Sequence, residues 1–295
     1  MSLAEPLRQA RESRFEVNGL AISGLSWGDP GETPLLALHG WLDNAASFAC
    51  LAPLLQGYHV VALDLTGHGR SDWRSADASY QIWDDLPEVL AVIDALGWDR
   101  FNLMGHSRGA IISTMMASSF PERVQKLVML DAVSPGPVMA EQFPQQLRKA
   151  LLEKPALLGR DNRVLSSVEA AIDSRCRTGL SRAAAEILVR RGIRGCQRGL
   201  TWTTDPRLHG ASAVKLTDGQ IRAVLSGLEM PTLLMVAQTN ARGIPDMVRR
   251  AKDYIPSVLV EDIEGGHHFH MESATAGVAQ RILAFLSSGE TNVKI

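Results

Sequence analysis

Short apolar runs that alternate with helical patterns constrain the fold of this chain most strongly. Each run has four to six residues, which is too short for a helix, and is too apolar to alternate between two faces. We therefore interpret these runs as parallel strands that are buried on both faces. The six runs cover residues 35–38, 60–63, 101–104, 126–130, 232–236 and 258–263. The helical patterns cover residues 84–96, 108–119 and 275–286. Together they predict an α/β protein with a mostly parallel, doubly wound sheet.

A β-hairpin is expected before the first of these runs. Two short segments, 15–17 and 20–22, flank the pair Asn18-Gly19. Asn and Gly both tolerate the positive φ angles of a type I′ turn, which is the commonest connection of a two-residue hairpin.

The alternation of strands and helices fails between residues 134 and 228. That stretch predicts several helices without strands, at 145–152, 168–175 and 182–191. We therefore expect a core formed by residues 15–133 and 229–288, with residues 134–228 inserted as a helical cap. Such a cap would lie over the carboxyl ends of the strands, where open α/β sheets bind ligands.

A G-x-S-x-G pattern marks the candidate nucleophile. Gly105-His106-Ser107-Arg108-Gly109 follows the run 101–104 and opens a helical pattern, as a nucleophile elbow requires. A second copy at residues 24–28 runs into the turn Asp29-Pro30-Gly31 and therefore does not fit. We predict that Ser107 is the nucleophile. The alternative is a serine that only caps the helix.

The candidate base lies in a cluster of histidines after the last apolar run. His267, His268 and His270 all fall within residues 264–272. Because His267 directly follows two glycines and is closest to the strand end, we predict that it takes the proton from the serine hydroxyl. The alternative is a zinc site, since imidazoles at such spacing coordinate zinc. No acidic or Cys residue has a compelling ligand spacing, so we expect no metal. We also expect no bound cofactor, because the protein itself would supply the nucleophile, the base and the oxyanion donors.

The acid that orients the histidine is less obvious. The run 232–236 leads to Asn240, at a position where an Asp would be expected, and an amide cannot carry the charge that stabilises imidazolium. Asp131 stands at the end of the preceding strand and is our prediction. Asp246 is the alternative, and Asp131 could instead only cap the loop that follows it.

Two backbone N–H groups are predicted to form the oxyanion hole that acyl transfer needs. One belongs to Arg108, the residue after the nucleophile, and the other to Trp41 after the strand that ends at His39-Gly40. The side chain of His39 is expected to be structural.

These motifs occur in the order typical of the α/β-hydrolase superfamily, which the chain resembles from about residue 15 to residue 286. The matching motifs are His39-Gly40-Trp41, residues 64–71, residues 105–109 and Gly266-His267. In detail the chain is similar to the serine hydrolase-like, esterase-type branch. The resemblance implies hydrolysis, and a structural, loop-shaping role for residues 64–71. The place of Asp131 is similar to that of the acid in many haloalkane dehalogenases. Those enzymes and the epoxide hydrolases of this fold use an aspartate nucleophile, so Ser107 argues against both activities.

Composition narrows the class of protein further. The formal net charge of −2 in 295 residues indicates neither a nucleic-acid binder nor a disordered chain, and no apolar run is long enough to span a membrane. The N-terminal residues lack the apolar core of a secretory signal. Cys50, Cys176 and Cys196 are too few for a disulfide framework, and a cytoplasmic location is expected.

The substrate class is the least constrained feature. Residues 135–228 carry a net charge of +7 against −9 for the rest of the chain, which would suit an anionic acyl donor. We favour the reading that arginines such as Arg190, Arg191 and Arg194 lie on solvated helix faces. The expected function is cleavage of a small-molecule carboxylic ester or thioester. Lactone or carbon–carbon bond hydrolysis is an alternative, as is a non-catalytic binding protein of the same fold.

Overall fold

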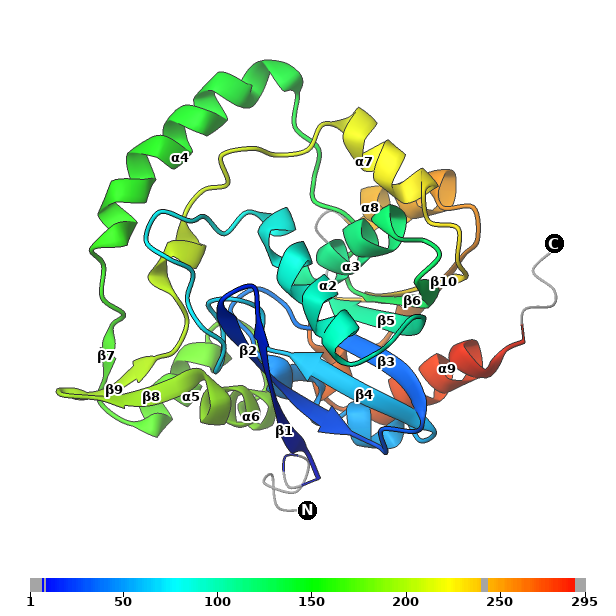
Figure 1. Ribbon diagram of the computed structural model, residues 1–295, viewed down its shortest axis with the longest axis horizontal. Coiled ribbons are helices and arrows are strands. Elements are labelled where there is room, and N and C mark those ends of the chain that lie inside the picture. The colour runs from blue at the N-terminus through cyan, green and yellow to red at the C-terminus, as the bar shows by residue number, and fades with distance from the viewer. Residues whose placement is uncertain (1–6, 8, 240–243, 290–295) are drawn as a thin grey trace.

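The computed structural model describes residues 7, 9–239 and 244–289, and within them the chain forms a central sheet of eight strands (Figure 1). The strand order is β1-β2-β4-β3-β5-β6-β10-β11. The strands are β1 (Arg11–Val17), β2 (Leu20–Trp27), β3 (Thr33–Leu38), β4 (Tyr58–Leu63), β5 (Phe101–His106), β6 (Val124–Leu130), β10 (Thr232–Ala237) and β11 (Val258–Ile263). All six apolar runs are therefore strands, as the sequence predicted.

Strands β1 and β2 form the expected antiparallel hairpin. Asn18 and Gly19 have φ angles of 51° and 76°, which a type I′ turn requires. Strand β2 is also antiparallel to β4, and each of the remaining neighbours is parallel. The parallel part therefore runs from β4 to β11, and its carboxyl ends meet at one edge.

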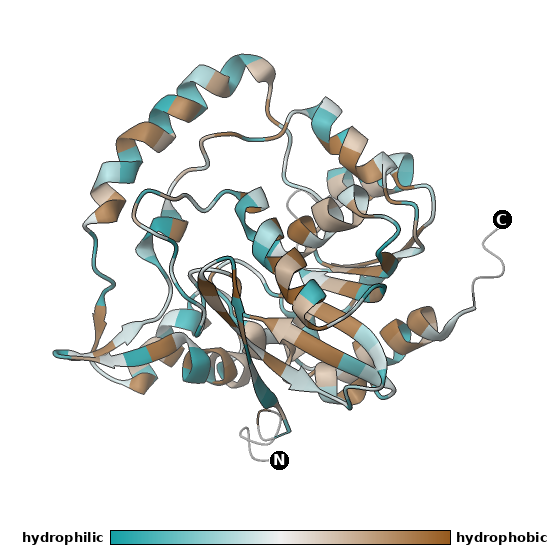
Figure 2. Cartoon of the chain, in the orientation of Figure 1, coloured by the Kyte–Doolittle hydropathy of each residue, from teal (hydrophilic) through white to brown (hydrophobic). Residues whose placement is uncertain are grey.

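The central strands of the sheet are buried on both faces because they are apolar at successive positions. In β3, Leu35 and Ala37 belong to one buried cluster, and Leu36 and Leu38 belong to the other. Figure 2 shows these strands as the apolar centre of the molecule. Helices α2 (Leu86–Ala95), α3 (Arg108–Ser119), α7 (Asp218–Ser226) and α8 (Ile244–Tyr254) pack on one face, and α9 (Thr275–Ser287) packs on the other (Figure 1).

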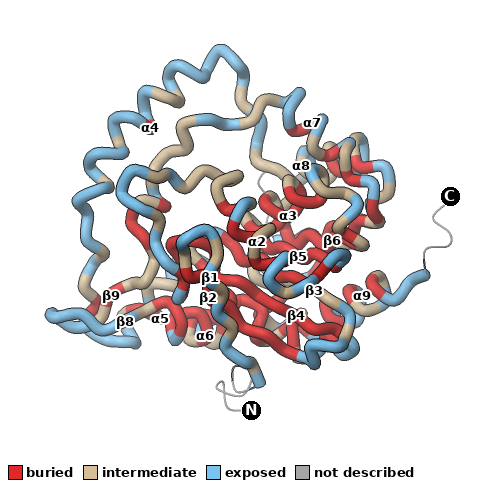
Figure 3. Tube along the Cα trace, viewed as in Figure 1, coloured by how far each residue is buried: buried red, intermediate tan, exposed pale blue. Residues whose placement is uncertain are grey.

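Residues 134–228 connect β6 to β10, which are neighbours in the sheet. They contain α4 (Phe143–Leu158), α5 (Val168–Cys176), α6 (Arg182–Gly192) and α7. Helix α4 arches away from the sheet and buries only Ala150 (Figures 1 and 3). Short 3₁₀ helices complete the chain: η1 (Ala45–Phe48), η2 (Ala52–Leu54), η3 (Ile82–Asp85), η4 (Ala140–Gln142), η5 (Pro206–His209) and η6 (Phe269–Met271).

The expectation that this connecting segment lacks strands was wrong. It contains a small antiparallel sheet in the order β7-β9-β8, formed by β7 (Val164–Leu165), β8 (Ile193–Cys196) and β9 (Gly199–Trp202). Strands of two to four residues are too short to show a period in the sequence. The turn between β8 and β9 also lacks the Asn-Gly or Asp-Gly pair that would have indicated a hairpin.

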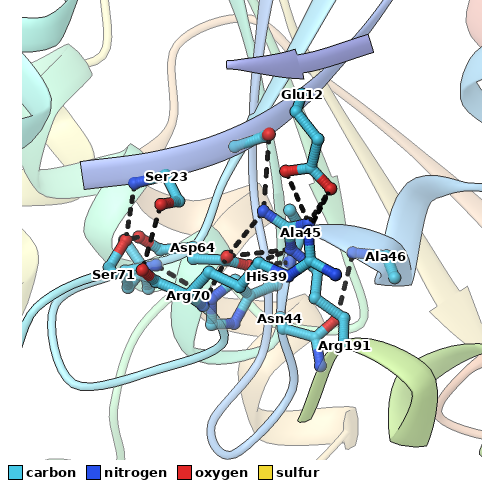
Figure 4. Close-up of polar contacts among 12 residues, drawn as sticks. Glu12, Ser23, His39, Asn44, Ala45, Ala46, Asp64, Arg70, Ser71 and Arg191 are labelled. Atoms are coloured by element: carbon cyan, nitrogen blue, oxygen red, sulfur yellow. Dashed lines mark hydrogen bonds and ion pairs between the residues drawn. The ribbon is translucent and has the colours of Figure 1, made fainter. Parts of the chain in front are cut away.

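Arg191 at the end of α6 ties the connecting segment to the sheet (Figure 4). It is 4% exposed, and its guanidinium contacts both carboxylate oxygens of Asp64 at 2.8–3.0 Å. It also contacts Glu12 of β1 at 2.9 Å. Asp64 is fully buried and further accepts hydrogen bonds from the backbone N–H groups of Ala45 and Arg70. The expectation that Arg191 lies on a solvated helix face was therefore wrong, whereas its neighbour Arg190 is exposed.

We expect Arg191→Met to lower the free energy of unfolding by about 3–5 kcal/mol, because the buried Asp64 carboxylate would lose its counter-charge. Arg190→Met is the matched control and should change it by less than about 0.5 kcal/mol. Urea unfolding of the two variants and the wild type measures both effects. Equal losses in the two variants would show that the Asp64 contact does not stabilise the fold.

Candidate active site

Ser107 lies on a sharp turn between β5 and α3. Its φ and ψ angles are 51° and −118°, a strained conformation that is rare outside functional turns. A Cβ atom on Gly105 would lie 2.4 Å from the Gly109 carbonyl oxygen, and one on Gly109 would lie 2.0 Å from that of Leu38. Both glycines are therefore required for the turn. By contrast, Ser26 of the other G-x-S-x-G copy lies inside β2 and pairs with β1 and β4.

Asp131 and His267 are brought together at the carboxyl edge of the sheet. His267 Nδ1 lies 2.5 Å from Asp131 Oδ2, and this carboxylate side chain is fully buried. Asp131 Oδ1 accepts a hydrogen bond from the backbone N–H of Ala237 at 2.8 Å. Because the carboxylate holds the proton on Nδ1, the Nε2 atom of His267 is left with a lone pair that can accept one.

The alternative acid lies elsewhere. Asp246 is on α8, its side chain is 77% exposed, and it pairs with Arg249 at 3.4 Å. Asn240, where the usual pattern would have an Asp, lies outside the described residues. The geometry therefore favours Asp131 as the partner of His267.

Direct contacts also tie His267 and Asp131 to the turn that carries Ser107. His106, which precedes the serine, donates a hydrogen bond from Nε2 to the His267 carbonyl oxygen at 2.8 Å, and the two rings lie 4.7 Å apart. The backbone N–H of Ser107 donates to the Leu130 carbonyl, one residue before Asp131. The three residues predicted from the sequence thus lie on adjoining loops at the carboxyl edge.

Two backbone N–H groups that we predicted as oxyanion donors lie at the ends of neighbouring strands. Arg108 is the first residue of α3, where backbone N–H groups have no partner within the helix. Its guanidinium is held by the buried Asp85 at 2.9 Å. Trp41 follows β3, and its indole Nε1 donates to the Leu208 carbonyl of the connecting segment at 3.0 Å.

Two buried histidines shape the loops around these donors. His39 Nε2 accepts a hydrogen bond from the backbone N–H of Leu65, and His68 Nε2 accepts one from that of Leu42. Burial lowers the pKa of both histidines, so each is neutral and able to accept. These contacts agree with the structural roles that we expected for His39 and for residues 64–71.

A second group of charged and imidazole side chains lies beside His267, and the sequence did not indicate it. Asp43 Oδ2 is 3.1 Å from His268 Nε2 and 3.8 Å from His106 Nδ1. Arg175 of α5 contacts the other oxygen, Oδ1. Burial alone would raise the pKa of Asp43, but the hydrogen bond to His268 and the nearby positive charges hold it below its usual range. Asp43 is more than 200 residues from His268 in the chain, so no ligand spacing could have revealed the pair.

Known proteins match both the chain and the fold. A family model for the α/β-hydrolase fold matches residues 33–168. A serine hydrolase-like protein of Dictyostelium discoideum is 30% identical over 91% of this chain and 79% of its own length. A serine hydrolase-like protein of Danio rerio is 30% identical over 95% of this chain and 89% of its own length. The chain therefore belongs to the α/β-hydrolase family, and within it to the serine hydrolase-like branch.

Solved structures agree with this assignment. A hypothetical protein from Pseudomonas aeruginosa PAO1 is 37% identical, with a TM-score of 0.89 over 94% of this chain and 99% of its own. A thioesterase domain from the curacin biosynthetic pathway is 28% identical, with a TM-score of 0.80 over 93% of this chain and 99% of its own. These similarities support hydrolysis as the class of activity. In the part of the chain that the structure describes, no helix has the length and apolarity needed to cross a bilayer.

Proposed function

We propose that this protein is a serine hydrolase that cleaves carboxylic esters or thioesters through an acyl-enzyme on Ser107. The observation that carries the proposal is the 2.5 Å contact between His267 and Asp131, on loops that adjoin the strained turn of Ser107. A histidine oriented by a buried carboxylate, next to a strained turn bearing a serine, is the arrangement that activates a hydroxyl for acyl transfer.

The steps follow from the chemistry of these groups. His267 Nε2 takes the proton of the Ser107 hydroxyl as its oxygen attacks the acyl carbon. The backbone N–H groups of Trp41 and Arg108 stabilise the oxyanion, and Asp131 stabilises the imidazolium. His267 then protonates the leaving alcohol or thiol, and a water molecule releases the acid by the same steps. Apart from this water molecule, the protein's own side chains and backbone supply every group that these reaction steps need.

The connecting segment 134–228 is our candidate cap over this site. It contacts loops that follow two strands of the sheet, β3 and β11. These contacts are Trp41 to Leu208, Asn44 to Leu188, and Glu272 to the backbone N–H of Ser181. A hollow of about 230 Å³ lies between α4 and the loop 78–81. Leu151, Leu157 and Tyr80 contribute to its mostly apolar lining, and we propose that it holds the acyl chain.

The test is turnover of p-nitrophenyl esters and acyl thioesters of increasing acyl length. We expect wild type to show a preferred length, and Leu157→Trp to shift that preference to shorter chains by filling the hollow. Leu152→Trp is the matched control, because Leu152 is an exposed residue of the same helix that does not line the hollow. An unchanged length preference in Leu157→Trp would place the acyl chain elsewhere.

A fluorophosphonate label separates the remaining alternatives. An activated Ser107 reacts with the label whatever the natural substrate is, whereas the serine of a non-catalytic binding protein does not. Labelling without turnover of any of the p-nitrophenyl esters or acyl thioesters would favour lactone or carbon–carbon bond hydrolysis. Absence of both would favour the binding protein.

A further inference from the structure

Three side chains beside the candidate active site form a cluster whose ligand atoms face one another. One ligand atom from each of Asp43, His106 and His268 lies within 4.8 Å of the other two. Asp43 Oδ2 is 3.1 Å from His268 Nε2 and 3.8 Å from His106 Nδ1. Asp43 and His106 are buried, and the side chain of His268 is 13% exposed. The proposed hydrolysis uses none of these three side chains.

The Nδ1 atom of His106 is the unusual feature of this cluster. Its other nitrogen, Nε2, contacts the His267 carbonyl oxygen, which can only accept, so Nε2 must carry the proton. With the proton on Nε2, the Nδ1 atom of the imidazole bears a lone pair. This atom is fully buried and has no hydrogen-bond partner among the described residues. It faces a carboxylate oxygen 3.8 Å away.

We propose that Asp43, His106 and His268 bind a divalent transition metal, with Zn²⁺ as the reference ion, and that this metal inhibits the enzyme. Two imidazoles and a carboxylate are a common zinc ligand set, and a metal would pair with the orphaned lone pair and the carboxylate at once. The remaining positions would be taken by water. This departs from the expectation of no metal, which rested on the absence of an acidic partner near the histidines in the sequence.

The surroundings of the cluster have the features of a metal site's outer shell. Metal-ligating histidines usually donate their other N–H to a carbonyl or carboxylate, and His106 does so to the His267 carbonyl. Arg175 orients the Asp43 carboxylate through Oδ1 and leaves Oδ2 directed at both imidazoles. On binding, the metal replaces the proton shared by Asp43 and His268, so it competes with that hydrogen bond.

The inhibitory part of the inference rests on the proposed function. Tetrahedral zinc with bonds of about 2.0–2.1 Å brings its ligands to about 3.3 Å from one another. The cluster must therefore contract, and its histidines directly precede Ser107 and directly follow His267. The charge of the metal would also oppose formation of the His267 imidazolium, whose ring lies 4.7 Å from that of His106 and 5.2 Å from that of His268.

Equilibrium dialysis against ZnCl₂, without substrate, tests the site itself. We expect wild type to retain one tightly bound Zn²⁺ per chain, and Co²⁺ to give the visible absorption of a low-symmetry site. His268→Gln and Asp43→Asn should each weaken binding by about 100-fold or more. His209→Gln is the matched control, because it removes an exposed histidine outside the cluster and should leave binding unchanged. Circular dichroism confirms folding, and if Asp43→Asn does not fold, His268→Gln alone decides.

Two results would overturn the site: no zinc retained by wild type, or equal zinc affinity in wild type and His268→Gln. Inhibition is tested separately by ester turnover, which should fall over the same zinc concentrations that fill the site and recover with EDTA. Full turnover with the site occupied would overturn the inhibitory role. If the protein cleaves no ester at all, dialysis still decides the zinc site, so that the two failures are distinguishable.

Discussion

Replacing Ser107 with alanine is expected to lower kcat for p-nitrophenyl ester hydrolysis by a factor on the order of 10⁵–10⁶. No other hydroxyl occupies the strained turn between β5 and α3, so the variant has no atom to form the acyl-enzyme. The fluorophosphonate label should also be lost. What remains is rate enhancement from substrate binding and from the oxyanion donors, whose positions the substitution leaves in place.

The chain supplies its own control for this experiment. Ser26 has the same G-x-S-x-G flanks, but it lies inside β2 with only weak hydroxyl contacts, to Ser13 Oγ at 3.4 Å and the Arg11 carbonyl at 3.5 Å. Ser26→Ala should therefore keep wild-type turnover and labelling. Equal activity in Ser107→Ala and wild type would exclude the acyl-enzyme and favour water activated by another group.

Asp131→Asn is expected to lower kcat by about 10⁴-fold while leaving the fold intact. The carboxamide is nearly the same size, but its NH₂ group cannot accept the His267 Nδ1–H that Asp131 Oδ2 now accepts at 2.5 Å. If the amide oxygen turns to His267, the NH₂ group then faces the backbone N–H of Ala237, another donor. In either orientation one hydrogen bond is lost, and the imidazolium loses its counter-charge.

Asp246→Asn is the matched control, because Asp246 was the alternative acid and its side chain is 77% exposed on α8. Its kcat should stay within about twofold of wild type. A large loss in Asp246→Asn with little loss in Asp131→Asn would transfer the acid role. Near-UV circular dichroism of both variants distinguishes lost catalysis from lost packing.

The sheet and the residues at its carboxyl edge were predictable because their signals are local. Helix α3 covers the predicted residues 108–119. Its start was predictable because the apolar run before Ser107 and the two glycines around it define a turn from strand to helix. Asp131 could be chosen because it directly follows a strand that ends at the same edge. In these cases the period of the pattern or the order of the motifs carries the information.

The remaining features depend on contacts between distant parts of the chain. Arg190 and Arg191 are adjacent and alike in sequence, and only the buried carboxylate of Asp64, more than 120 residues away, makes one of them a core residue. Asp43 and His268 are 225 residues apart in the chain, and only the tertiary fold brings them together. The strands of the β7-β9-β8 sheet are stabilised by their neighbours rather than by a pattern of their own.

The pairing of β6 with β10 has a consequence for how such a protein can diversify. The two strands are hydrogen-bonded neighbours, with Leu130 opposite Met235. The connecting segment 134–228 therefore leaves the sheet and returns to it at the same place. The entropic cost of closing a loop grows only slowly with its length. A longer or shorter connecting segment therefore changes the free energy of folding very little through loop closure. The length of the connecting segment can therefore change without disturbing the strand ends that hold Ser107 and Asp131, as long as Arg191 still pairs with the buried Asp64. With residues 134–228 as the proposed cap and Ser107 as the proposed nucleophile, the choice of substrate can change independently of the hydrolytic chemistry.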